Sequence, residues 1–203
     1  FFLQTCDFIF PSPGIDLDLY DEYKSKFVSE LDFFYQHWQK PVLAITGTLG
    51  KTTLTTLLNQ SLNAAGIKSV AAGNISPAMC DVLDSEYEQV VLELSSFQLE
   101  LSKKFAPDFA IFTNFYPNHL DRHKTLDRYF LAKQNIFINQ SSDQIVLMPI
   151  CFYERIKNLS IKSKLYFFSE LEIHQIPDIC RGVFFKSGTK VIFTDGAQEK
   201  EID

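Results

Sequence analysis

The sequence contains no apolar run of the ~18 residues that a membrane-spanning helix requires, although 46% of its 203 residues are hydrophobic. Cysteine is scarce, since only Cys6, Cys80, Cys151 and Cys180 are present and no two of them form a C-x-x-C pair. We therefore expect reduced thiols in a cytoplasmic protein rather than a disulfide scaffold. The 19 basic residues are outnumbered by 25 acidic ones, and the net charge of -6 disfavours nucleic acid or a membrane as partner.

Several patterns that would indicate other classes of protein are also missing. The chain has no internal repeat and no low-complexity segment. No G-x-S-x-G turn surrounds Ser95 or Ser96, so acyl-enzyme chemistry is not indicated. No apolar run ends in the aspartate of a Walker-B strand, which disfavours a transport or signalling ATPase. The chain begins at Phe1 rather than Met, and we expect it to be a piece of a longer protein.

Residues 44–56 read AITGTLGKTTLTT, an apolar run followed by a glycine-bearing loop, a lysine, two threonines and a helical pattern. Glycines let backbone N–H groups close around phosphate oxygens, the lysine reaches terminal phosphates, and a threonine hydroxyl can hold Mg²⁺. Gly50, Lys51 and Thr52 fit the end of the G-x-x-x-x-G-K-[ST] pattern, but Ile45 stands where its first glycine belongs. The variant with glycine at 47 and 50 indicates a narrower group of ATP enzymes.

Apolar runs of strand length alternate with helical patterns along the chain. The runs are 42–46, 69–72, 90–94, 109–113 and 145–148, and the helical stretches are 51–65, 77–83, 97–104 and 126–139. This alternation predicts an α/β fold of P-loop type, with a mostly parallel, doubly wound sheet covered on both faces. A further helix is expected over 18–38, and two apolar runs around Ser187-Gly188-Thr189 predict an added antiparallel hairpin.

Polar side chains follow the predicted strands at the points where the strands end. Asn74 follows the second run, Glu93 closes the third, Asn114 follows the fourth, and His119 lies shortly beyond it. Open parallel sheets bind ligands beyond the carboxyl ends of their strands. These side chains and the loop before Lys51 are therefore predicted to share one edge of the sheet.

Each of these residues also has a purely structural interpretation. Glu93 stands among apolar neighbours, where burial is costly unless a cation or hydrogen bonds compensate. We expect Mg²⁺ there, with a structural hydrogen-bond partner as the alternative. Taken alone, His119 could be a packed or surface histidine, and Lys133 could be a solvated lysine on a helix.

Five segments, TGTLGKTT, GNIS-PA, LELSSFQLE, NHLDRH and YFLAKQNI, occur in an order and spacing that resembles the Mur ligase family. Within it, ELSSFQLE and HLDRH most resemble the branch that adds D-glutamate to UDP-N-acetylmuramoyl-L-alanine in peptidoglycan synthesis. Branches that add meso-diaminopimelate or lysine usually carry a histidine where this chain has Phe97. The resemblance is dense over residues 42–137 and weaker beyond them, and Ser12 to Ile15 resembles the close of the family's UDP-binding domain.

The resemblance implies an ATP-dependent ligase that forms an amide bond through an acyl phosphate. It assigns Lys51 to the ATP phosphates, Thr52 and Glu93 to one Mg²⁺ ion, and His119 and Lys133 to a second ion. Lys133 is expected to be carbamylated by CO₂, so that a cation becomes a metal-binding carbamate. The implied catalytic residues are Lys51, Glu93, His119 and Lys133, the ATP-binding residues Gly47, Thr48, Gly50, Lys51, Thr52, Thr53 and Asn114, and the substrate-binding residues Gly14, Asn74, Ser95 and Gln98.

The family's organisation implies that residues 1–39 end an N-terminal UDP-substrate domain and that 40–203 form an incomplete central ATP-binding domain. The C-terminal domain would then be absent, and the isolated piece inactive. The implied partners are UDP-N-acetylmuramoyl-L-alanine, D-glutamate and ATP, and a monomer is expected. Leu49 and Ser76 replace the family's usual Asn and Gly, and Leu49 lacks an amide that could hydrogen-bond near the phosphates, which puts nucleotide handling in question. The alternatives are another Mur-type or folylpolyglutamate-type ligase and a non-catalytic ATP-binding fragment.

Overall fold

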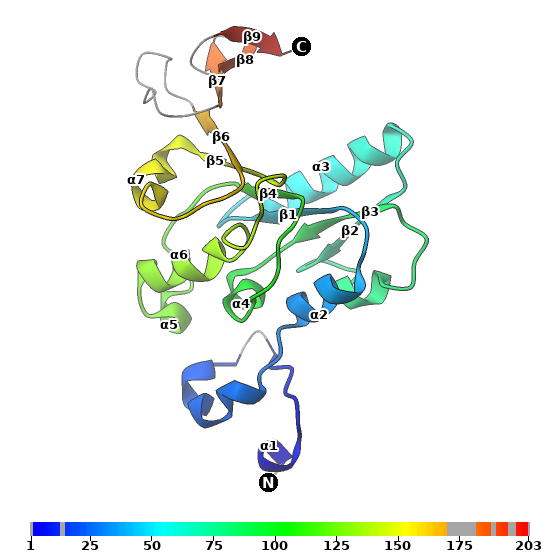
Figure 1. The fold of residues 1–203 in the computed structure, drawn as a ribbon, viewed down its shortest axis with the longest axis vertical. Coiled ribbons are helices and arrows are strands. Elements are labelled where there is room, and N and C mark those ends of the chain that lie inside the picture. Colours follow the sequence, from blue (N-terminus) through cyan, green and yellow to red (C-terminus); the bar gives the residue numbers. More distant parts are fainter. Residues whose placement is uncertain (1, 13–14, 170–181, 188–189, 195–197, 203) are drawn as a thin grey trace.

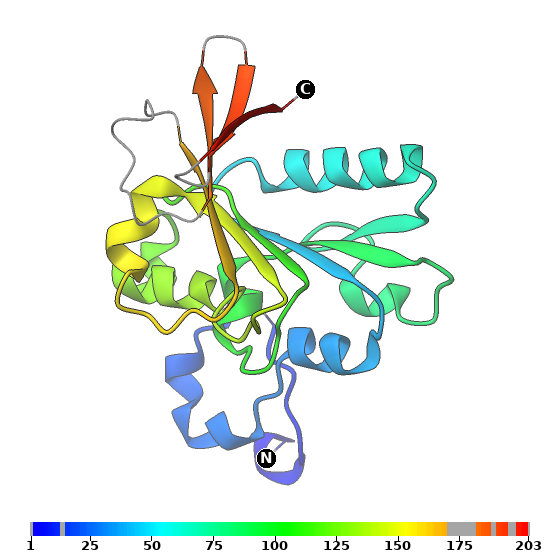
Figure 2. The ribbon, with the colours of Figure 1, turned by 45° about the horizontal axis from the view of Figure 1, so that its top comes forward.

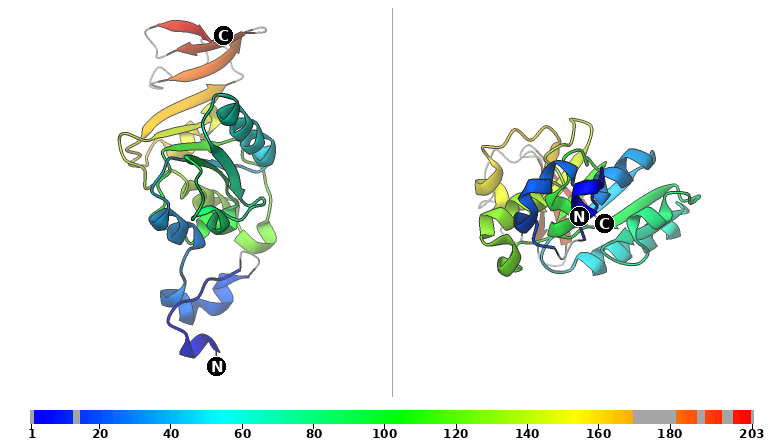
Figure 3. Two further views of the ribbon diagram at one scale, coloured as in Figure 1. Left: turned by 90° about the vertical axis from the view of Figure 1, so that its right-hand side faces the viewer. Right: turned by 90° about the horizontal axis from the view of Figure 1, so that it is seen from below.

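The computed structural model describes residues 2–12, 15–169, 182–187, 190–194 and 198–202. Gly14, one of the predicted substrate-binding residues, lies outside the described residues. The molecule is elongated, with the N-terminal segment and the last strands at opposite ends of its long axis and the main sheet between them (Figure 1, Figure 3).

A single sheet runs through the described chain in the order β2-β3-β1-β4-β5-β6-β7-β8-β9. Strands from β2 to β7 pair in parallel, and only β7–β8 and β8–β9 pair antiparallel. The mostly parallel sheet and the antiparallel hairpin are thus confirmed, while β6 and β9 extend the sheet beyond the predicted strands. The strands are β1 (Val42–Thr46), β2 (Ser69–Gly73), β3 (Gln89–Glu93), β4 (Phe109–Phe112), β5 (Ile145–Pro149), β6 (Lys164–Ser169), β7 (Val183–Ser187), β8 (Lys190–Thr194) and β9 (Glu199–Ile202).

Helices cover both faces of the parallel part, as Figure 2 shows for α3 on one side and α2 on the other. The α-helices are α1 (Phe2–Thr5), α2 (Glu30–His37), α3 (Lys51–Ala64), α4 (Ser96–Glu100), α5 (Leu120–His123), α6 (Leu126–Gln134) and α7 (Tyr153–Ile156). Short 3₁₀ helices are η1 (Leu17–Lys26), η2 (Met79–Val82) and η3 (Ile150–Phe152). No helix in the described part of the chain is long and apolar enough to cross a bilayer.

Alternate residues of each central strand enter different cores, which explains why these strands read as continuous apolar runs. In β1, Val42 and Ala44 belong to the larger core, which also holds side chains of α2, α4 and α6. Ile45 faces the other side, where Leu54 and Leu58 of α3 pack against the sheet. A fold with both faces covered is therefore the structure that this pattern requires.

The predicted helix over residues 18–38 is wrong as a single element. The chain forms η1, then an extended stretch in which Phe27 makes a β-bridge with Ile9 from before η1, and then α2. Ser29 starts α2, because its hydroxyl accepts the backbone N–H of Asp32. No residue of η1 is buried, so no packing holds this part of the chain in a longer helix.

The helix expected over 97–104 is also shorter than predicted, because a distant carboxylate captures its end. Asp32 of α2 accepts the backbone N–H groups of Lys103, Lys104 and Phe105 and the hydroxyl of Ser102. These bonds replace the helical ones, and α4 ends at Glu100. Similarly, the stretch 77–83 forms only η2, and α6 ends at residue 134 rather than 139 before a run of turns.

Candidate active site

The strand order reverses around β1, which lies between β3 and β4, and this reversal fixes where a ligand crevice opens. The loop of residues 47–50 leaves the carboxyl end of β1 and enters α3. Gly47 has φ 148° and Gly50 has φ 77°, conformations that favour glycine. A Cβ atom at Gly47 would lie 1.9 Å from the hydroxyl oxygen of Thr113, so only glycine fits there without displacing the neighbouring strand end.

Asn114 holds this loop in shape from the end of β4. Its side-chain oxygen accepts the N–H groups of Thr48 (3.2 Å) and Leu49 (2.9 Å), and its amide nitrogen donates to the carbonyl of Leu49 (3.0 Å). The Leu49 side chain is 61% exposed, so the residue contributes through its backbone. The departure from the expected Asn at this position thus falls on a residue that is largely exposed to solvent.

Helix α3 begins without a side-chain cap, because its N-cap residue is Gly50. The first N–H groups of a helix have no intrahelical acceptor, and the helix dipole favours an anion at this end. Lys51 is the first residue of α3, and its ammonium donates to the carbonyl of Thr48 at 3.1 Å. This arrangement is suited to binding phosphate.

Glu93 lies at the end of β3 with 2% of its surface exposed, and both carboxylate oxygens have a donor. One oxygen accepts the hydroxyl of Thr52 at 2.6 Å, and the other accepts the side-chain amide of Asn74 at 2.8 Å. Asn74 also donates its backbone N–H to the Glu93 carbonyl. Gly73 permits this close approach, since a Cβ there would lie 2.4 Å from that carbonyl oxygen.

A hydroxyl and an amide held beside one carboxylate fit Mg²⁺, which uses few protein carboxylates and completes its octahedron with water and substrate phosphates. Among the described residues, no group of three or more His, Cys, Asp or Glu side chains is arranged to bind a metal. A metal at Glu93 would therefore depend on Thr52, on Asn74 and on oxygens from water or a bound phosphate.

Lys133 projects from α6 into the interior and is 2% exposed. Its ammonium donates to the carbonyl of Gly47 (2.8 Å) and the hydroxyl of Thr46 (3.3 Å), and lies 4.9 Å from the ring centroid of Tyr129. Burial, followed by the nearby charge of Lys51, lowers the pKa of Lys133 to about 7, and Glu93 opposes the shift. A large share of this amine is therefore neutral near pH 7.

His119 is exposed and caps α5 with a left-handed φ of 52°. Its ring centroid lies 5.1 Å from that of Phe97 and 6.2 Å from that of Tyr129. His119 does not hydrogen-bond to Lys133 in the contacts described, although both face the same cavity. That cavity has a volume of about 210 Å³ and is lined by Gly47, Thr48, Lys51, Asn74, Ser95, Ser96, Phe97, His119, Tyr129 and Lys133.

The remaining predicted residues lie around this cavity rather than in it. Glu93 is hydrogen-bonded to Asn74, which lines the cavity, and to Thr52, which is exposed on the first turn of α3. Thr53 is exposed on the first turn of α3. Gln98 accepts the N–H and hydroxyl of Ser95 in a capping box and lines a separate small pocket.

Tyr129, which lines the cavity, and His123, which contacts the lining residues Ser96 and Phe97, were not identified from the sequence. Tyr129, 1% exposed, places its hydroxyl 3.4 Å from that of Thr48. His123, 2% exposed, has Nε2 2.9 Å from the hydroxyl of Ser96 and stacks on Phe97 at 8°. The segment HLDRH contained a signal for His123, because residues four apart lie on one side of a helix.

Burial, followed by the charge of Arg122, lowers the pKa of His123 to about 4. The imidazole binds a proton near pH 6.5 in the unfolded chain but only near pH 4 in the folded one, so protonation favours unfolding. The contribution of neutral His123 to the free energy of unfolding is therefore complete above about pH 6.5 and is lost as the pH falls towards about 4. We expect the free energy of unfolding of the wild type, measured by urea denaturation, to fall by roughly 1–3 kcal/mol over this interval through His123. In His123→Gln the free energy of unfolding should depend less steeply on pH, whereas His37→Gln, at an exposed histidine, should behave as wild type. An equal pH dependence in all three proteins would contradict the prediction.

Comparisons with known proteins agree with this geometry. Residues 45–195 match the family model of the Mur ligase middle domain. The chain is 36% identical over its whole length to the UDP-N-acetylmuramoylalanine--D-glutamate ligase of Thermoanaerobacter sp. (strain X514), covering 45% of that protein. It is 37% identical to the same-named ligase of Ruminiclostridium cellulolyticum, over 94% of this chain and 41% of that one. The chain thus spans under half the length of these relatives.

Solved structures show the same fold at low identity. MurF ligase from Thermotoga maritima in complex with ADP aligns with a TM-score of 0.57 at 17% identity, over 87% of this chain and 45% of that one. FolC of E. coli in complex with DHPP and ADP aligns with a TM-score of 0.52 at 14% identity, over 94% and 58%. The sheet order, the loop before α3 and the matched family model lead to one conclusion: the chain belongs to the Mur ligase family.

Proposed function

We propose that this chain is the ATP-binding part of a ligase that joins D-glutamate to UDP-N-acetylmuramoyl-L-alanine in peptidoglycan synthesis. The observation that carries the proposal is the convergence of Lys51, His119 and Lys133 on one cavity, in which the lining residue Asn74 is hydrogen-bonded to Glu93 and Glu93 to Thr52. Relatives of 36% and 37% identity carry the name of this ligase, which supports the choice of substrate. The ADP named with two structural neighbours supports a nucleotide at the loop before α3.

The chemistry requires activation, because a carboxylate does not condense with an amine at neutral pH. An oxygen of the substrate carboxylate attacks the γ-phosphorus of ATP, and ADP leaves. The amine of D-glutamate then attacks the acyl phosphate carbon, and phosphate leaves as the amide bond forms. Phosphoryl transfer depends on positioning and charge neutralisation rather than on covalent help from the protein.

Lys51 and the N-terminus of α3 hold the phosphates in this proposal. Thr52, Glu93 and Asn74 form the most suitable Mg²⁺ site, since they place a carboxylate, a hydroxyl and an amide together. When bound, Mg²⁺ would neutralise charge on the phosphates and hold them near the substrate carboxylate. The backbone of residues 47–50, fixed by Asn114, orients the nucleotide.

Lys133 in its ammonium form is not a metal ligand, so a second metal near His119 requires its modification. Only the neutral amine attacks CO₂, forming an N–C bond and releasing a proton, and a pKa of about 7 supplies that amine at neutral pH. The carbamate then presents two oxygens where the ammonium stood. His119 faces the same cavity and would be the protein's nitrogen ligand beside it.

The test is amino-acid-dependent phosphate release by the full-length protein that carries this chain. With ATP, Mg²⁺ and UDP-N-acetylmuramoyl-L-alanine present, we expect release with D-glutamate and none with L-alanine, L-lysine or meso-diaminopimelate. Release with a folate and L-glutamate would favour a folylpolyglutamate-type ligase. Tight ATP binding without release under any condition would indicate a non-catalytic module. Since these substrates are small cytoplasmic metabolites, the proposal agrees with the location expected from the composition.

A further inference from the structure

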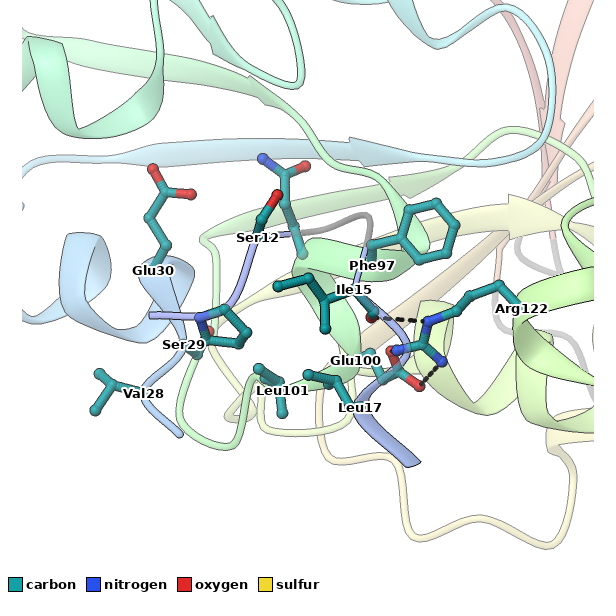
Figure 4. Close-up of a pocket in the computed structure, with 12 residues that line it drawn as sticks. Ser12, Ile15, Leu17, Val28, Ser29, Glu30, Phe97, Glu100, Leu101 and Arg122 are labelled. Carbon is teal, nitrogen blue, oxygen red and sulfur yellow. Dashed lines mark hydrogen bonds and ion pairs between the residues drawn. The ribbon is translucent and has the colours of Figure 1, made fainter. Parts of the chain in front are cut away.

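An arginine of α5, Arg122, contacts residues 15 and 16 of the N-terminal segment at the edge of the site. Arg122 donates from Nε to the carbonyl of Ile15 (3.1 Å) and from a terminal nitrogen to the carboxylate of Glu100 on α4 (2.8 Å). Its other terminal nitrogen lies 3.7 Å from the carboxylate of Asp16. Figure 4 shows the Arg122 side chain between the Ile15 backbone and Glu100. One guanidinium thus joins three segments that are far apart in the sequence.

Arg122 is more enclosed than two other cations that pair with Asp16 and Asp18 of this segment. Its side chain is 10% exposed, whereas Lys124, which pairs with Asp16, is 49% exposed and Arg128, which pairs with Asp18, is 53% exposed. Exposed ion pairs contribute little, while a partly desolvated, forked pair fixes geometry. Among these three contacts, Arg122 is therefore the one that can determine where the segment lies.

The same arginine also touches the wall of the active-site cavity. Its guanidinium carbon lies 6.0 Å from the ring centroid of Phe97, and Phe97 lines both the cavity and the small pocket beneath the N-terminal segment. Phe97 in turn packs against His119, and the backbone N–H of Arg122 donates to the backbone carbonyl of His119 at 3.1 Å. A continuous set of contacts therefore runs from Ile15 through Arg122 to His119.

We propose that Arg122 is a positioning residue. It fixes residues 15–18 relative to the side chains of Phe97 and His119, so that a substrate in contact with both places its carboxylate at a constant position beside the phosphates of ATP. This proposal rests on the ligase function proposed above. Arg122 would align the nucleotide-sugar substrate and would make no contact with ATP. The loop before α3, which would hold ATP, is not among the Arg122 contacts.

The test compares Arg122→Gln, Arg122→Lys and the control Arg128→Gln in the full-length protein. Calorimetry and steady-state kinetics should show Kd and KM for UDP-N-acetylmuramoyl-L-alanine raised about tenfold in Arg122→Gln, with the Kd for ATP with Mg²⁺ within about twofold of wild type. Arg122→Lys should recover only part of the loss, because an ammonium cannot serve the forked carboxylate and the Ile15 carbonyl together. Arg128→Gln should match wild type.

Two results would overturn the proposal: unchanged affinity for the UDP-linked substrate, or equal losses for that substrate and ATP together with a lower unfolding temperature. Wild-type protein that neither binds the UDP-linked substrate nor turns over would instead refute the proposed ligase function. In that event, hydrogen exchange tests the contacts from Ile15 through Arg122 independently of ligand binding. Faster exchange at residues 15–19 in Arg122→Gln, with α3 unchanged, would support it, and no difference would overturn it.

Discussion

Lys133→Ala is expected to abolish ligation in the full-length protein, and a short carboxylate such as acetate is expected to restore part of it. An alanine leaves room at a position that is 2% exposed and faces the cavity, so a small carboxylate can take the place of the lost carbamate. The measurement is D-glutamate-dependent phosphate release with and without acetate. Lys103→Ala, at an exposed lysine, is the matched control and should retain full activity.

The carbamylation of Lys133 should depend on pH, because the pKa of this lysine is lowered. A lysine with an ordinary pKa near 10.4 is neutral in roughly one molecule in 2,500 at pH 7, whereas a pKa of about 7 leaves about half of the amine neutral. Carbamylation should therefore increase as the pH rises through 7. Full activity in buffer stripped of CO₂, with an unmodified Lys133 by mass spectrometry, would contradict the assignment.

Lys51→Met is expected to lower ligation by at least ~100-fold, because an ammonium beside the transferring phosphoryl group is worth several kcal/mol when water is excluded. Methionine keeps much of the side chain's length and bulk, so the change removes charge rather than packing. Lys68→Met, at an exposed lysine before β2, serves as the control. Turnover of Lys51→Met within a few-fold of wild type would refute the phosphate-binding role.

The same substitution should also change the chemistry at Lys133. The Lys51 charge is, after burial, the next cause of the lowered Lys133 pKa. Its removal should raise that pKa and shift carbamylation to higher pH. Measuring CO₂ uptake against pH in wild type and Lys51→Met separates this electrostatic coupling from the direct effect on ATP, since no nucleotide is required.

Local patterns were sufficient to predict the central fold. Each buried strand presents apolar residues to both faces, as Val42 and Ile45 do in β1, so the runs were recognisable without knowledge of their partners. The loop of Gly47 and Gly50 was equally visible, because it needs backbone conformations that glycine adopts most readily. The placing of Asn74, Glu93 and Asn114 at one edge then followed from the rule for parallel sheets.

Helix limits could not be predicted, because contacts with distant residues set them. Asp32 ends α4 by binding backbone groups some 70 residues further along the chain, and no local signal announces that bond. His123 and Tyr129 were missed for a related reason. Histidine and tyrosine on short helices occur in many settings, and only packing shows that Tyr129 lines the cavity and that His123 contacts Ser96, another of its lining residues.

The sequence by itself determined which strands are buried, where the loop of Gly47 and Gly50 lies and which polar groups reach the end of the sheet, since these depend on neighbours along the chain. Only the tertiary structure decided the lowered pKa of Lys133, the pairing of Glu93 with Thr52 and Asn74, and the hydrogen bond from Arg122 to the Ile15 carbonyl. The physical reason is that burial and charge act through space. The free energy of a buried ammonium or carboxylate is set by the atoms that surround it after folding, and the chain supplies those atoms from distant positions.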